Sequence, residues 1–136
     1  MNSRLDRYFE AEVLHADPLK LVALLCRGAL DAVASAQVAL EAKDIPARSR
    51  QILKAWEIVE ELRRSLNHEQ GGNISRQLAD LYAYVGQRLL DANKEQSGQP
   101  LTEAAIVLTT LAEAWQEIQQ QTQPVLDDYV PLTVAC

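Results

Sequence analysis

The helix-breaking residues of this chain stand between long segments that contain almost none of them. Glycine and proline number five each among 136 residues, which is below average usage. Gly28 and Gly86 are the exceptions inside a segment. The breakers that separate the segments are Pro18, Pro46, the pair Gly71-Gly72, Gly98 and Pro100. Apolar residues make up 48% and aromatic ones only 5%, so we expect helices rich in Ala and Leu that bury one core without metals or disulfides.

Within each segment, apolar residues recur every three or four positions, which is the spacing of one apolar face on an α-helix. The recurring residues are Val22, Leu25, Ala29, Val33, Ala36 and Leu40 in the first segment; Ile52, Trp56, Val59, Leu62 and Leu66 in the second; Ile74, Leu78, Leu81, Tyr82, Val85 and Leu89 in the third; and Ala105, Leu108, Leu111, Ala112, Trp115 and Ile118 in the fourth. Long helices joined by short loops pack antiparallel. The pattern therefore predicts an all-α fold, an antiparallel four-helix bundle with a short N-terminal helix or arm.

The chain is predicted to be a single domain, residues 1–136, with three parts. Residues 1–16 form an N-terminal arm, residues 17–122 the four-helix core, and residues 123–136 a flexible tail. Asp17-Pro18 opens the first helix, 67–73 is a loop, and Pro124 ends the last helix. In the second helix we expect Glu60 to pair with Arg64, four residues on.

Charge and cysteine content exclude several classes of protein. Thirteen basic and 19 acidic residues leave a net charge of −6, which disfavours binding to nucleic acid or an anionic membrane. Cys26, within an apolar run, is interpreted as a buried hydrophobe, and with Cys136 makes no disulfide framework. We see no secretory signal and no long apolar run, so we expect a cytoplasmic protein without membrane insertion.

The residues that enzymes use are scarce. One Glu-x-x-His string occurs, Glu12 to His15, whereas a di-iron bundle needs two. His68 stands near a helix end and is interpreted as a turn residue rather than a phosphotransfer site. No nucleophile elbow, phosphate loop or nucleotide fingerprint is found. We therefore predict no enzymatic activity, no catalytic residue, no metal site and no cofactor.

The third helix has two apolar sides. Leu78, Tyr82, Val85 and Leu89 form one side, and Leu81, Tyr84 and Arg88 form another. In the simpler interpretation one set fills the core and the other is partly exposed. In the alternative interpretation one set lines a groove that receives an amphipathic helix of another protein.

In the order of these features the chain resembles the FliS family, the flagellin-specific export chaperones. The residues that carry the resemblance are Tyr8, Pro18, Leu19 to Leu25, Gly28, Leu66-Asn67, Gly71-Gly72, Ile74, Leu78, Leu81-Tyr82, Tyr84, Arg88-Leu89, Ala92-Asn93 and Ala114-Trp115. The chain departs from the family pattern at Cys26-Arg27, where an aromatic and an acidic or amide residue are usual, and at Asn73, where an acidic residue is usual. These departures concern the shape of a groove rather than the architecture.

The resemblance implies a cytoplasmic export chaperone that binds the disordered C-terminal segment of flagellin. Binding would prevent premature polymerisation and assist delivery to the flagellar type III export apparatus. The residues implied to line the flagellin groove are Ile74, Leu78, Tyr82, Val85 and Leu89, with packing in the core as the alternative for each.

Leu5 and Tyr8 would contact the export-gate protein, or the arm would fold back and cover the groove. Self-association into a homodimer through the groove or the arm stays open. The alternative function is a generic helical adaptor or regulatory protein with another partner.

Overall fold

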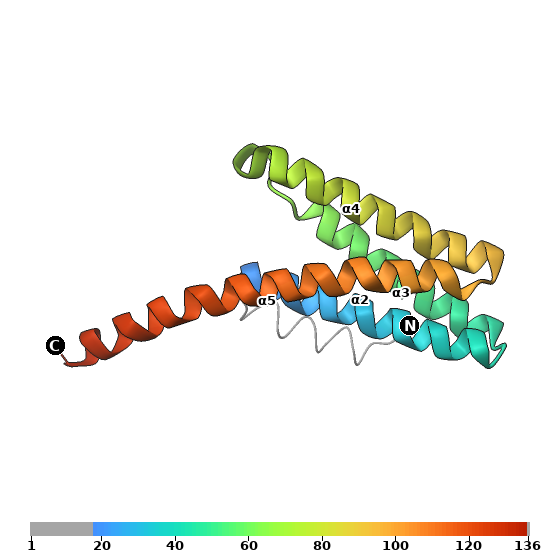
Figure 1. The fold of residues 1–136 in the computed structure, drawn as a ribbon, viewed down its shortest axis with the longest axis horizontal. Helices are drawn as coiled ribbons and strands as arrows, with labels where there is room; N and C mark the ends of the chain where they lie inside the picture. Colours follow the sequence, from blue (N-terminus) through green and yellow to red (C-terminus); the bar gives the residue numbers. More distant parts are fainter. Residues whose placement is uncertain (1–17, 136) are drawn as a thin grey trace.

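Four helices account for nearly all of the described chain. The computed structural model describes residues 18–135, in which the helices are α2 (Pro18–Glu41), α3 (Ile45–Arg64), α4 (His68–Glu95) and α5 (Gly98–Ala135). They pack as a helical bundle, with no strand in the described range, which confirms the predicted fold class (Figure 1). The predictions for Leu5, Tyr8, Glu12, His15 and Asp17 lie outside the described residues.

Short polar caps define where α3 and α4 begin. The side chain of Asp44 accepts a hydrogen bond from Ala47 N at 3.2 Å, and Pro46 occupies the first turn of α3. Asn67 does the same for α4, since its Oδ1 accepts from Gln70 N at 3.1 Å. Each cap satisfies a backbone N–H that has no partner inside its own helix.

The predicted loop over 67–73 is wrong, because α4 already begins at His68. The helical path is interrupted only at Gly72, whose φ of 54° and ψ of −126° produce a kink. Glycine adopts this conformation without steric cost, so a single residue redirects the chain where a loop was expected. The Ser75 hydroxyl donates to Asn67 O at 3.0 Å and holds the two sides of the kink together.

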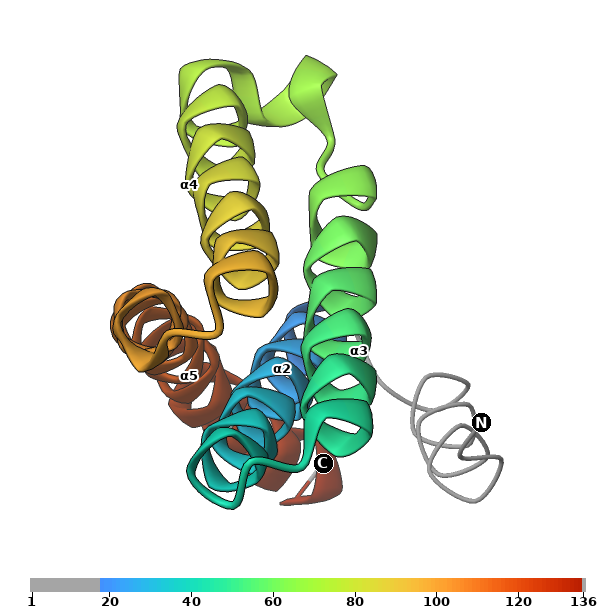
Figure 2. The ribbon, with the colours of Figure 1, turned by 90° about the vertical axis from the view of Figure 1, so that its right-hand side faces the viewer.

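The helices contact one another as a closed ring. Each of α2, α3, α4 and α5 packs on the next, and α2 packs on α5 (Figure 2). In the described range the backbones of α2 and α4, and of α3 and α5, lie diagonally across the core, with no Cα atoms within 8 Å of each other, and only side chains meet between α2 and α4. The stretch from Lys20 to Glu41 is long and apolar enough by composition to cross a membrane. About 33% of its apolar window is buried, including Ala29 and Val33, which lie in the core, whereas Val38 is 67% exposed.

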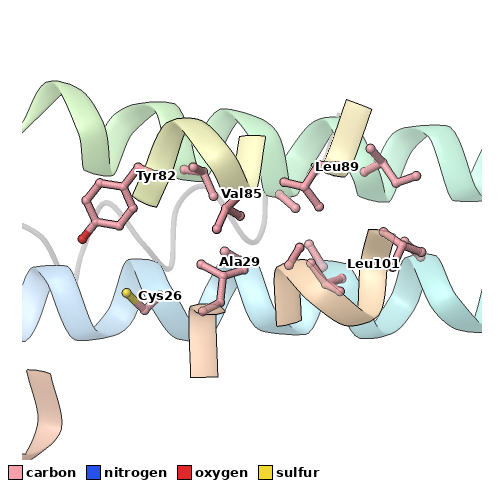
Figure 3. Close-up of a cluster of buried hydrophobic side chains, with 14 of the residues drawn as sticks. Cys26, Ala29, Tyr82, Val85, Leu89 and Leu101 are labelled. Atoms are coloured by element: carbon pink, nitrogen blue, oxygen red, sulfur yellow. The ribbon is translucent and has the colours of Figure 1, made fainter. Parts of the chain in front are cut away.

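Small side chains on α2 bring the helices together. Ala29, Ala32 and Ala36 are buried beside Val33 and Cys26, so large side chains of the other helices reach across to α2. In Figure 3, Tyr82 points from α4 towards Cys26, Val85 towards Ala29, and Leu89 towards Leu101 of α5. The predicted burial of Cys26 is confirmed.

Two local predictions are wrong. Glu60 pairs with Arg63 at 2.7 Å and Glu61 with Arg64 at 2.9 Å, so both ion pairs span three residues instead of four. Pro124 does not end the last helix, because α5 continues to Ala135. A proline inside a helix removes one backbone hydrogen bond and bends the axis, which need not end the helix.

Candidate functional site

Three of the five predicted groove residues lie in the core. Tyr82, Val85 and Leu89 are at most 1% exposed and contact α2 and α5. In this structure they fill the core, as in the simpler of the two interpretations of this side of the helix. Their role in binding a partner stays a prediction.

The other two predicted groove residues, Ile74 and Leu78, lie near the surface together with Leu81, which was not among the predicted groove residues. Ile74 is 67% exposed, Leu81 is 40% exposed, and Leu78 between them is half-buried against the core. Ile74, Leu81 and Arg88 follow one another at intervals of seven residues, so they share one side of α4. Because the Arg88 Nε atom lies 2.9 Å from Glu103 Oε2 of α5, that side of α4 faces α5.

On α5 a matching apolar side chain lies further along. Ile118 is 41% exposed and stands about four helical turns beyond Glu103, about 60° round the helix from it. Figures 1 and 2 show that α4 and α5 are close at the connection between them and diverge towards the beginning of α4. We call Ile74, Leu78, Leu81 and Ile118 the apolar strip. Three of its four residues, all but Leu78, are exposed.

A polar cluster holds the two helices together at the closed end of the strip. Glu103 of α5 accepts a hydrogen bond from the Tyr84 hydroxyl at 3.3 Å, and its Oε2 lies 2.9 Å from Arg88 Nε. The latter contact is an ion pair by distance but is not aligned as a hydrogen bond. Arg88 also donates from Nη1 to Asp91 Oδ2 at 3.1 Å. These contacts limit how far the helices separate here.

Three polar-tipped side chains, Cys26, Tyr82 and the partly buried Trp115, belong to the core or pack against it. Burial raises the pKa of the Cys26 thiol to about 12. Burial also raises the pKa of Tyr82 to about 12, with a further increase from Cys26 and an opposing effect of the nearby Trp115 indole. Trp115 Nε1 is itself buried without a hydrogen bond of good geometry. Both Cys26 and Tyr82 are therefore neutral at physiological pH and act as apolar packing.

No group of His, Cys, Asp and Glu side chains that could hold a metal ion occurs within the residues that the structure describes. Sequence reasoning placed Leu81 on the second apolar side of its helix but did not assign it to the groove. Its spacing of seven residues from both Ile74 and Arg88 was the available signal.

Comparisons with known proteins identify the family. The profile of the family described as "Flagellar protein FliS" matches residues 1–122. The flagellar secretion chaperone FliS of Salmonella typhimurium is 36% identical over 110 residues, which cover 80% of this chain and 82% of that protein. The chaperone FliSB of Pseudomonas aeruginosa is 36% identical over 109 residues, covering 80% and 86%.

A more distant relative agrees. FliS of Bacillus subtilis is 28% identical over 113 residues, covering 83% of this chain and 84% of that protein. These relatives are named as chaperones and not as enzymes, in accordance with the scarcity of catalytic residue types. The resemblance seen in the residues is thus confirmed, and the chain belongs to the FliS family of flagellar secretion chaperones.

Proposed function

We propose that this chaperone is cytoplasmic and binds the disordered C-terminal segment of flagellin, which folds as a helix along the apolar strip. The observation that carries the proposal is the exposure of Ile74 and Leu81 on the side of α4 that faces α5, in a chain of the flagellar secretion chaperone family. An amphipathic helix recognises its partner by inserting apolar side chains into such a surface. When the apolar side chains of the flagellin segment are inserted in this way, they are covered, which would prevent premature polymerisation of flagellin.

The free-energy cost of ordering the flagellin segment also favours its release. Ordering a disordered segment costs about 2–5 kcal/mol of the gross binding energy, so affinity is moderate and the cargo is removable at the export apparatus. No nucleotide is required for holding. Leu5 and Tyr8 are proposed to contact the export-gate protein, as the family resemblance implies.

A titration with a flagellin C-terminal peptide tests the proposal. We expect calorimetry to show saturable binding at micromolar concentrations of peptide. Ile74→Asp should weaken binding about tenfold or more, because a carboxylate would be desolvated in the interface. No saturable binding to the unmodified chain would overturn the proposal and leave the alternative of an adaptor with another partner.

A matched control separates the strip from general surface apolarity. Val38 of α2 is 67% exposed, as is Ile74, but its helix lies diagonally across the bundle from α4. Val38→Asp should therefore leave peptide affinity unchanged. Equal losses in the two variants would place the binding surface elsewhere.

A further inference from the structure

The contact between α4 and α5 is the least extensive of the four contacts that close the ring of helices. It also involves the buried polar atoms that are least well satisfied. Among the buried side-chain nitrogen and oxygen atoms of the described residues, two have no well-aligned hydrogen-bond partner, and these are Arg88 Nε on α4 and Trp115 Nε1 on α5. A buried donor without a partner disfavours the arrangement that buries it. Both observations favour separation of the helices at this contact over separation at the other three.

One carboxylate links the two helices. Glu103 Oε2 of α5 lies 2.9 Å from Arg88 Nε of α4 and accepts a hydrogen bond from the Tyr84 hydroxyl at 3.3 Å. The other oxygen, Oε1, accepts from Gln99 Nε2 of α5 at 3.3 Å. These polar contacts between α4 and α5 thus converge on a single side chain, and a change at Glu103 alters all of them together.

This link lies close to the connection between the two helices. α4 ends at Glu95, and Gln96 adopts a left-handed conformation with φ of 54° and ψ of 45° before α5 begins at Gly98. Glu103 stands about 8 Å along α5 from Gly98, whereas Trp115 stands about 26 Å along it. A change of angle at the connection therefore displaces Trp115 about three times as far as Glu103.

Separation beyond the link would uncover apolar side chains that are now half-buried. Leu78 on α4 and Trp115 on α5 are packed against the core, and each is partly exposed. Leu78 belongs to the apolar strip, and the Trp115 indole lies near Tyr82 of α4. An apolar segment binds more tightly to the arrangement that offers it more apolar surface.

We propose that Glu103 and Arg88 are positioning residues that hold α4 and α5 in a closed arrangement, and that the flagellin segment binds best when the two helices separate beyond this ion pair. The inference rests on the proposed function. The ion pair limits the affinity for the segment instead of adding to it, because only the open fraction of the molecules is competent to bind. Without cargo, closure keeps Leu78 and Trp115 partly covered.

Glu103→Lys tests the proposal, because it places two cations opposite each other at the link. The chain has two tryptophans, so all proteins are compared in a Trp56→Phe background in which Trp115 alone emits. With Glu103→Lys we expect emission at longer wavelength without peptide, as water reaches the indole, and a dissociation constant for the flagellin C-terminal peptide about threefold lower or more. Arg88→Glu combined with Glu103→Lys restores opposite charges and should reverse both changes.

A matched control makes the same charge change elsewhere. Glu57 is exposed on α3, which lies diagonally across the bundle from α5, so Glu57→Lys should alter neither the emission nor the affinity. Glu103→Gln removes the charge without repulsion and should act in the same direction as Glu103→Lys, to a smaller extent. Circular dichroism verifies that each variant is folded.

The two measurements separate this proposal from the proposed function. Unchanged emission with both Glu103 variants, or weaker peptide binding by them, would overturn the role of the ion pair. A chain that binds no peptide, but whose emission responds as expected, would overturn the proposed function and still support the closed and open arrangements of α4 and α5.

Discussion

At the scale of single residues, two buried groups make the folded state sensitive to alkali. Cys26 and Tyr82 titrate near pH 12 in the folded protein, although the ordinary values are 9.0 and 10.0. The unfolded chain therefore loses these protons first as the pH rises. Each group contributes stability that is fully present below its unfolded pKa and is lost as the pH rises through its folded pKa.

We accordingly predict that the free energy of unfolding falls between about pH 9 and pH 12, with each group contributing up to about 1.4 kcal/mol per pH unit. Urea unfolding at several values in this range measures the slope. Cys26→Ala removes one of the two groups and should flatten the dependence. The same slope in both proteins would show that Cys26 does not contribute.

A second residue-scale prediction concerns a buried guanidinium. Arg48 is 6% exposed, and its Nε donates to Asn93 Oδ1 at 3.2 Å. Ser49 Oγ donates to the same oxygen at 3.1 Å. Asn93→Ala leaves the donor of Arg48 without this acceptor and should lower the free energy of unfolding by about 1–3 kcal/mol.

An exposed asparagine provides the comparison. Asn73 Oδ1 also accepts from an arginine, Arg76, but both residues are exposed. Asn73→Ala should change the free energy of unfolding by less than about 0.5 kcal/mol, because water replaces the lost partner. If urea unfolding shows the same loss of free energy of unfolding in both alanine variants, burial does not account for the contribution of the Arg48 contact.

At the scale of elements, α4 depends on one glycine and tolerates the replacement of another. Gly72 has a backbone conformation that other residues adopt only under strain, so Gly72→Ala should cost about 1–3 kcal/mol. Gly86 is helical, and a Cβ there would meet Trp56 at 3.5 Å, an ordinary contact. Gly86→Ala should be neutral or stabilise by up to about 1 kcal/mol. Thermal unfolding of both variants checks the opposite signs.

Element-level prediction from the sequence succeeded where the signal is local. Apolar periodicity identified all four helices, because one helix face is encoded by residues three and four apart. The ends were less accurate: Asn67 caps α4 at the first residue of the expected loop, and α5 continues past Pro124. A capping residue, a kink and a proline each allow a helix either to end or to continue, and the surrounding contacts decide which occurs.

The site was predicted less well than the fold, because exposure is not a local property. Periodicity showed two apolar sides on α4, but which one is buried depends on how α4 lies against α2 and α5. Tyr82, Val85 and Leu89 are buried there, while Ile74 and Leu81 are exposed where α4 diverges. The pairing of Arg48 with Asn93 spans 45 residues, and no spacing rule reveals it.

At the scale of the whole molecule, the proposed function predicts a thermal effect. A peptide that binds only the folded state at a hundredfold excess over its dissociation constant adds about 2.7 kcal/mol of stability. For a domain of this size the melting temperature should rise by roughly 8 °C. Because the strip is apolar, the shift should persist at high salt. A shift that disappears with added salt would indicate charge-driven binding instead.

The contact between α2 and α5 has a consequence for biosynthesis. The first and last helices of the ring are neighbours, so the apolar side of α2 has no α5 to pack on until α5 has been made. During translation α2, α3 and α4 leave the ribosome before α5, with Val33 and Leu89 not yet covered by it. The bundle closes only once α5 has left the ribosome, so a ribosome stalled within α5 would hold a nascent chain with the unfinished core exposed to proteases.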